Sequence, residues 1–222
     1  IMDIENQDLL LLKICDLSLT IENTRFEAFV FQLYQELERA GIYFKPKCYL
    51  TDGWGCPNRV PVIGVPFYLV DQELCSLKSQ LTGSKVEDDK KIMMYLRHEA
   101  GHAFNYTYRL YRKPEWRHLF GRFSQPYKDD YEVVPFSTKF VHYFPKCYAQ
   151  KHPDDDFAET FAVWLRPNSK WQKRYDGTLA LTKLLYVDKM VCKYGQQPPV
   201  ITNGKLDMPF QKITITVDEW FK

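Results

Sequence analysis

The sequence predicts an α+β domain in which a small twisted sheet packs against a long helix. Apolar residues recur at helical spacing in several segments, most clearly over residues 25–40. The apolar segments 11–21 and 42–51 are typical of strands. Glycines and prolines between residues 53 and 66 separate short extended pieces. A chain of 222 residues is long enough to bury the core of one such domain.

The first part of the chain is expected to supply two strands and one helix. Residues 11–21 alternate only partly, so the first strand carries a bulge or is buried on both faces. Thr24 and Glu27 have the spacing of a capping box. Gly41 follows the last periodic residue, as is usual at helix C termini. Residues 42–51 then form the second predicted strand.

Prolines limit the next strand to the edge of the sheet. Phe67 to Val70 is apolar and strand-like. Pro61 and Pro66 precede it, and proline cannot donate to a sheet ladder. We therefore expect an edge strand here, followed by a short helix over residues 71–81.

The rest of the domain is expected to be helical, with one long irregular stretch. Asp88 or Asp89 can cap the first of these helices, and Pro167 stops the second. The expected segments are a helix over about 90–110, a loop-rich stretch over about 114–153, and helices over 154–165 and 178–194.

The chain after Gly195 is turn-rich and is predicted to be a C-terminal tail. We expect residues 1–195 to form the domain and residues 196–222 to be flexible or to add a late strand. Ile213, Ile215 and Val217 alternate as such a strand would.

The composition excludes several classes of protein. A hydrophobic share of 45%, with 15 Phe, 15 Tyr and 5 Trp, excludes disorder for most of the chain. The formal net charge of +2 argues against a nucleic-acid or membrane-surface binder. No stretch approaches the roughly 20 apolar residues of a membrane span. The six cysteines form no Cys-x-x-Cys pair, which favours reduced thiols and a cytoplasmic protein.

A His-Glu-x-x-His motif lies inside the predicted helix of residues 90–110. His98 and His102 are four residues apart, so both imidazoles lie on one face and can reach one ion. Zinc binds imidazole nitrogen, and its catalytic sites use three protein ligands plus water. Glu99 can reach a water on that ion, the position of a general base.

The helix of residues 154–165 offers the third ligand. Asp155 and Glu159 share a face that borders an apolar stripe, where carboxylates are costly unless they are paired or bind metal. A solvated helix N terminus, where acids favour the helix dipole, explains Asp154 and Asp156 well. It explains Glu159, one turn further in, less well.

These two motifs together resemble the gluzincin type of zinc metallopeptidase, which implies a zincin-like fold. The resemblance implies that Asp155 binds the metal, and that Glu159 lies behind it and contacts His98. The chain is more similar still to the putative zinc-binding metallopeptidases of bacteria over roughly residues 12–192. The stretches that carry this similarity are Arg97–His102, Leu119–Gly121, Tyr148–Gln150, His152–Pro153, Asp156–Ala162, Pro66–Leu69 and Ala180–Leu184.

The sequence departs from the family pattern at the third ligand. The family usually has Glu where this chain has Asp155, which is one methylene shorter. Aspartate is a competent zinc ligand. The departure nevertheless leaves open that Glu159 binds the metal directly.

Other candidate site residues have weaker signals. In a remote gluzincin, a Tyr seven residues before the carboxylate ligand points at the metal. By that resemblance Tyr148 would donate to the developing oxyanion, although most tyrosines pack in cores. His152 could line the cleft or support a turn, and either His152 or His142 could replace Asp155 as a ligand. The resemblance also implies that the Phe67–Val70 strand pairs with an extended substrate.

We therefore expect a hydrolase that holds one Zn²⁺ per chain and cleaves peptide bonds in a peptide or protein substrate. Two alternatives remain: a hydrolase of non-peptide amides, and a zinc-containing binding protein without catalysis. A nucleic-acid-associated protease is a weaker hypothesis that depends on the basic stretch from Arg109 to Arg122. A solvated face is the simpler explanation of that stretch in a nearly neutral chain. The sequence does not fix the oligomeric state.

Overall fold

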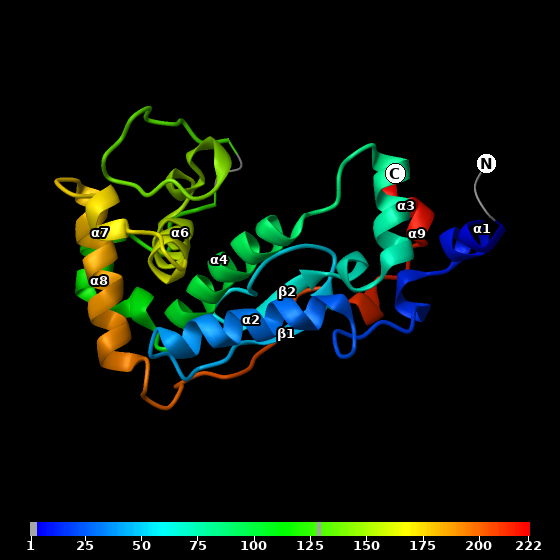
Figure 1. The fold of residues 1–222 in the computed structure, drawn as a ribbon, viewed down its shortest axis with the longest axis horizontal. Coiled ribbons are helices and arrows are strands. Elements are labelled where there is room, and N and C mark those ends of the chain that lie inside the picture. Colours follow the sequence, from blue (N-terminus) through cyan, green and yellow to red (C-terminus); the bar gives the residue numbers. More distant parts are fainter. Residues whose placement is uncertain (1–3, 128–129) are drawn as a thin grey trace.

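The computed structural model describes residues 4–127 and 130–222 and has an α+β architecture. Helices dominate it, and the sheet in the described part of the chain has two strands (Figure 1). The helices are α1 (Ile4–Leu11), α2 (Arg25–Arg39), α3 (Gln72–Thr82), α4 (Asp89–Thr107), α5 (Pro114–Phe120), α6 (Pro153–Leu165), α7 (Trp171–Arg174), α8 (Leu179–Tyr194) and α9 (Val217–Phe221). No helix among the described residues has the length and apolar character needed to cross a membrane.

The sheet consists of β1 (Lys47–Thr51) and β2 (Val62–Pro66), which run parallel. The register pairs Lys47 with Val62 and Thr51 with Pro66. All five residues of β2 are buried, so this strand lies inside the molecule. The loop of residues 52–61 returns along β2, where Gly55 forms an antiparallel bridge with Gly64. Gly64 is required there, because a Cβ would lie 2.7 Å from Cγ2 of Thr51.

The main core lies between the sheet and three helices. Helix α4 contacts β2 and α2 on one side and α6 on the other. Phe26 and Leu33 of α2 and Leu96 of α4 are fully buried in this core. Helix α8 covers the far side of α6, where Val163 and Leu184 belong to a second, smaller apolar cluster. The central helix α4 is thus fixed on both sides.

The crossing of α4 and α6 is unusually close because of a glycine. A Cβ built on Gly101 would lie 2.8 Å from Cα of Ala158 and 2.9 Å from its carbonyl oxygen. Real Cβ atoms essentially never come that close to other atoms. One turn further along, the rings of Phe104 and Phe161 stack with centroids 5.3 Å apart. These contacts set the distance between the two helices that carry the motif residues.

Several of the expected elements are present at nearly the expected positions. The structure confirms the long helices as α2, α4, α6 and α8, the short helix as α3, and the second strand as β1. Asp88 caps α4 by accepting from the amide of Lys91. The capping box expected at Thr24 does not form. Its hydroxyl donates to the carbonyl of Ile21, while the Glu27 carboxylate accepts from the amide of Asn23.

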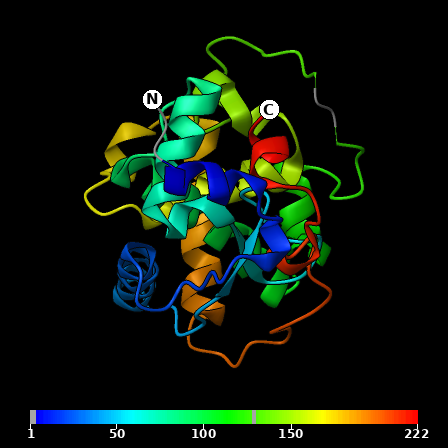
Figure 2. The same cartoon turned by 90° about the vertical axis from the view of Figure 1, so that its right-hand side faces the viewer.

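The strands predicted at residues 11–21 and 213–217 do not form, although the two segments lie next to each other. Residues 11–21 contain a 3-10 helix, Ile14–Asp16, and residues 213–217 lead into α9. Lys13 and Thr216 form one antiparallel bridge between these segments. Within residues 11–21 only Ile14 is fully buried, so no apolar face is long enough to hold a strand. Figure 2 shows the result, with α1 and α9 side by side.

The edge strand predicted at Phe67–Val70 is also wrong. These residues form a 3-10 helix, and the strand lies one step earlier as β2. Phe67, Tyr68 and Leu69 are consecutive buried residues, a pattern that does not distinguish a strand from a helix. The segment that flanks β2 near the motif residues is the loop around Gly55.

The described part of the loop-rich stretch contains an α-helix, α5, that the sequence did not reveal. Pro114 lies in the first turn of α5, where its missing amide hydrogen costs nothing. Between Gly121 and α6 the described residues are mostly irregular, and part of this chain projects from the body of the molecule (Figure 2). Just before α6 they form a 3-10 helix, Pro145–Gln150.

The C-terminal tail packs against the main core. Phe210, Ile213, Val217 and Phe221 are buried in the main core. The amide of Ile201 donates to the carbonyl of Thr107 at the end of α4. Residues 196–222 therefore help to hold the last turn of α4.

Candidate metal centre

Helix α4 places the two motif histidines on one buried face. His98 is 3% exposed and His102 is 7% exposed. Their Nε2 atoms lie 3.1 Å apart. Two imidazole nitrogens held about 2.0–2.1 Å from one tetrahedral ion would lie about 3.3 Å apart. The observed spacing therefore suits two ligands of a single metal ion.

Helix α6 brings a carboxylate to the same point. Oδ1 of Asp155 lies 3.6 Å from Nε2 of His98 and 3.6 Å from Nε2 of His102. The three residues are buried, and they form the metal-site candidate among the described residues. Burial alone would raise the pKa of Asp155, but its contacts with the two imidazoles outweigh burial and hold it well below its usual range. Two nitrogens and one carboxylate oxygen are a donor set that zinc accepts.

A second carboxylate of α6 serves the other ring nitrogen of His102. Oδ2 of Asp154 lies 2.9 Å from Nδ1 of His102. The same carboxylate accepts from Nδ2 of Asn105 at 2.8 Å and from the hydroxyl of Tyr106. An acid in this position fixes the tautomer and the orientation of a ligating histidine. A solvated helix terminus was the expectation for Asp154, but this residue is buried, with 4% of its surface exposed.

Glu159 is buried, but it contacts backbone amides rather than His98, the contact that the resemblance implied. Its carboxylate accepts hydrogen bonds from the amides of Phe144, at 2.9 Å, and Ala149, at 3.2 Å. Within the described residues, Nδ1 of His98 has no hydrogen-bond partner. Glu159 thus holds the irregular segment before α6, and the expected hydrogen bond to His98 is absent. Burial raises the pKa of Glu159 to about 8, although the two amides oppose the rise.

Glu99 is placed beside the histidines with one oxygen unpaired. The residue is 4% exposed, and in the described part of the chain its Oε2 atom has no hydrogen-bond partner. Burial raises the pKa of Glu99, while His98 and His102 oppose the rise. A buried carboxylate oxygen without a partner is costly, so a group that binds at this point would find an acceptor ready.

A cavity of about 380 Å³ opens over these residues. Helices α4 and α6 supply its metal-facing side. Two irregular segments supply much of the rest, with Trp54 to Asn58 on one side and Phe123 to Tyr127 on the other. Tyr148 also lines the cavity, and its ring lies 5.8 Å from that of His98.

Tyr127 is a site residue that the sequence did not reveal. Its hydroxyl donates to Oδ2 of Asp155, and its ring stacks on His152 with centroids 4.7 Å apart. Tyr127 comes from the irregular chain after α5, so no motif or spacing connects it to α6. The raised pKa of Tyr127, due to burial and then to Asp155, keeps its hydroxyl protonated as a donor.

The two other histidines considered as ligands, His152 and His142, do not join the ligand group. His152 caps α6, because its Nδ1 accepts from the amide of Asp154 at 3.1 Å and its Nε2 lies 3.1 Å from the carbonyl of Gln125. His142 is exposed, and its amide contacts the hydroxyl of Tyr175. The turn role considered for His152 is therefore the one the structure shows.

A model of one protein family matches residues 76–214, which is well over half of the chain. The family is described as a "putative zinc-binding metallo-peptidase". This chain belongs to that family. No curated protein and no solved structure matches it.

The family match covers every residue of the candidate metal centre. It begins in α3 rather than near residue 12, and it extends beyond Gly195 into the packed tail. The N-terminal helix α2 and the sheet precede the matched region. The family model thus describes the mainly helical part of the chain, which carries the metal-facing residues.

Two buried ion pairs support the metal-facing helices of this family member. The guanidinium of Arg97, next to His98, donates to both oxygens of Glu36 at 2.7 and 2.8 Å and so ties α4 to α2. The ammonium of Lys183 lies 2.5 Å from Oδ2 of Asp156 and ties α8 to α6. Removing one partner of a buried pair leaves an uncompensated charge, which costs about 3–5 kcal/mol.

Proposed function

We propose that this protein is a zinc-dependent peptidase that holds one Zn²⁺ per chain through His98, His102 and Asp155. The observation that carries the proposal is the buried Oε2 of Glu99, which has no hydrogen-bond partner among the described residues, beside three converging ligand atoms. The family description supports both zinc and a peptide or protein substrate. A zincin-like arrangement, with the motif helix α4 between the sheet and the carboxylate helix α6, is part of the same proposal.

Glu99 is the proposed general base. When bound, zinc supplies a Lewis acid and lowers the pKa of a coordinated water toward about 7. Glu99 accepts a proton from the attacking water at Oε2 and returns it to the leaving amine. Its raised pKa suits this role, because a carboxyl that is easier to protonate holds the transferred proton longer.

Tyr148 is the proposed donor to the oxygen of the scissile carbonyl. It lines the cavity beside His98, and burial and then Asp155 raise its pKa, so the phenol stays protonated. Loss of one such donor typically costs about 10²–10³ in kcat. Asp154 is the proposed positioning residue for His102.

The test compares zinc-loaded wild type with Glu99→Gln on a library of proteome-derived peptides. We expect cleavage by the wild type only, with equal zinc content in both proteins. Equal cleavage by Glu99→Gln would overturn the proposed base. If the wild type binds zinc but cleaves only non-peptide amides, the protein is a hydrolase of non-peptide amides rather than a peptidase. A wild type with zinc and no hydrolysis of either kind would favour a binding protein.

A further inference from the structure

A second and larger cavity adjoins the metal cavity. Its volume is about 930 Å³, and six of its lining residues are basic or histidine: Arg59, Arg112, Lys113, Arg117, His118 and Arg122. No acidic residue of the described chain lines it. We call it the basic cavity. It gathers most of the Arg109–Arg122 stretch, together with Arg59 from the loop after β1.

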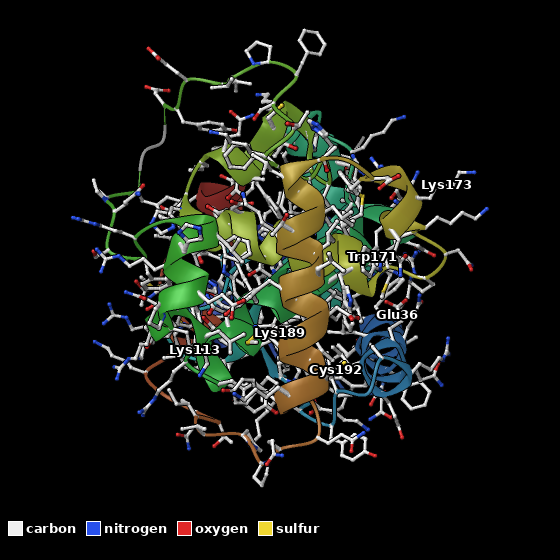
Figure 3. All side chains as sticks on the ribbon, turned by 90° about the vertical axis from the view of Figure 1, so that its left-hand side faces the viewer. Glu36, Lys113, Trp171, Lys173, Lys189 and Cys192 are labelled. Atoms are coloured by element: carbon white, nitrogen blue, oxygen red, sulfur yellow. The ribbon has the colours of Figure 1, made fainter. Side chains whose placement is uncertain are left out.

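Within the described residues, no carboxylate neutralises the arginines of the basic cavity. Among residues 4–127 and 130–222, no carboxylate forms an ion pair with Arg112, Arg117 or Arg122, nor with Arg59. Glu115, the acid of α5, is turned away and pairs with Lys189 of α8 at 2.9 Å. In Figure 3, Lys189 lies on the side of α8 that faces α5.

Aromatic rings hold two of these arginines without cancelling their charge. The guanidinium carbon of Arg59 lies 5.7 Å from the ring centre of Tyr111 and 5.4 Å from that of Phe123. The guanidinium carbon of Arg112 also lies 5.7 Å from the ring centre of Tyr111. A guanidinium held over a ring keeps its donors free for a carboxylate. The aromatic rings therefore fix the positions of Arg59 and Arg112, and no described carboxylate pairs with either guanidinium.

The two cavities share a wall. Phe123 lines both, and the neighbours Asn58 and Arg59 line the metal cavity and the basic cavity respectively. The ring of Phe123 lies 4.5 Å from Tyr111, in the basic cavity, and 6.1 Å from Tyr106, in the metal cavity. A ligand that extends past this aromatic wall from the metal centre would reach the arginines.

We propose that the basic cavity is a substrate subsite for Asp and Glu side chains, on one side of a bond that is cleaved at the metal centre. The inference rests on the proposed peptidase function. Carboxylates match the guanidinium fork. Nucleic acid fits less well, because the positive charge is confined to one cavity of a chain with a net charge of only +2. The subsite selects peptides with several acidic residues.

The first test measures binding separately from turnover. Fluorescein-labelled (Glu-Ser)₃ and (Gln-Ser)₃ peptides are titrated with the zinc-loaded full chain by fluorescence anisotropy. We expect the Glu peptide to bind, with salt-sensitive affinity, and the Gln peptide to bind at least tenfold more weakly. Arg112→Gln/Arg117→Gln should weaken binding of the Glu peptide about five- to twentyfold, because each exposed pair contributes about two- to fivefold.

The matched control removes two charges elsewhere. Arg39→Gln/Lys173→Gln takes exposed cations from α2 and α7, and Lys173 lies on the other side of α8 from Lys113 in Figure 3. We expect binding by this control to be unchanged. Equal weakening in both double variants would show a bulk charge effect and overturn the subsite. Tighter binding of a 12-nucleotide single strand, lost in Arg112→Gln/Arg117→Gln, would also overturn it in favour of nucleic acid.

A second readout separates this proposal from the peptidase proposal. On the peptide library, the wild type should cleave bonds with acidic residues enriched on one side. Arg112→Gln/Arg117→Gln should lose the enrichment through a higher KM at unchanged kcat. Binding without any cleavage would reject the peptidase and leave the basic cavity as an acidic-peptide site. Cleavage without enrichment, and without arginine-dependent binding, would reject the subsite and leave the peptidase.

Discussion

Nδ1 of His102 lies 2.9 Å from Oδ2 of Asp154, while Nε2 of the same ring lies 3.6 Å from Oδ1 of Asp155. Two consecutive residues of α6 thus face the two nitrogens of one imidazole. Asp154 holds the proton on Nδ1, which leaves the Nε2 lone pair free for a metal ion. A change at Asp154 should therefore act on the metal through the ring of His102.

Asp154→Asn should weaken zinc binding about 10–100-fold, the usual effect of losing the partner of a ligating histidine. Competition with a chelating dye measures the affinity. Asp176→Asn, an exposed carboxylate before α8, is the matched control and should leave the affinity unchanged. Wild-type affinity in Asp154→Asn would show that Asp154 does not orient the ring.

Zinc affinity should fall as the pH falls, and the fall should begin above pH 6.5. Burial tends to lower the pKa of His102, but the charge and hydrogen bonds of Asp154 and Asp155 outweigh burial and raise it well above 6.5. The protonated imidazole cannot bind zinc, so the proton competes up to that raised pKa and is released on binding. Titrations from pH 6 to 9 test this. A midpoint at or below 6.5, or no pH dependence, would contradict the expectation.

Asp155→Ala should lose zinc, whereas Glu159→Gln should retain it. Asp155 is equidistant from both histidine Nε2 atoms, and Glu159 accepts instead from two backbone amides. Weakening these acceptors in Glu159→Gln should lower the free energy of unfolding by about 1–3 kcal/mol. Metal content by mass spectrometry and urea unfolding report the two effects. The reverse pattern of metal loss would make Glu159 the third ligand.

Gly101→Ala should damage both stability and zinc binding. Its Cβ would lie 2.8 Å from the Ala158 backbone, so α6 must move away from α4 and carry Asp155 with it. Overpacking of this kind typically costs about 1–3 kcal/mol. Gly53→Ala is the control, because a Cβ there meets nothing within 4 Å. Thermal unfolding with and without zinc measures both effects, and a variant as stable as the control would refute the close-crossing argument.

The metal-facing residues of α4 could be predicted because the chemistry imposes a spacing on one helix. Four residues separate His98 from His102, and no distant contact is needed to place both rings on one face. The periodicity of the next helix placed Asp155 and Glu159 on one face, and only the resemblance to gluzincins implied Asp155 as the ligand. The structure adds the distances that bring the two helices together.

The supporting contacts were not predictable, because they depend on how segments meet. Asp154 has the same local sequence environment as a solvated N-terminal acid, and only the position of α4 buries it against His102. Tyr127 comes from a segment without periodicity. The strand predicted at Phe67–Val70 was wrong for a related reason. The consecutive buried residues Phe67–Leu69 fit a 3-10 helix as well as a strand, and tertiary packing decides which one forms.

The metal cavity has walls of irregular chain, Trp54–Asn58 and Phe123–Tyr127, over a floor of two helices. The metal-facing residues of α4 and α6 are therefore encoded in different stretches of the gene from these two walls. Irregular surface segments tolerate insertion and replacement far better than packed helices do. Relatives of this chain can thus diverge in what they select while inheriting the same metal-facing helices.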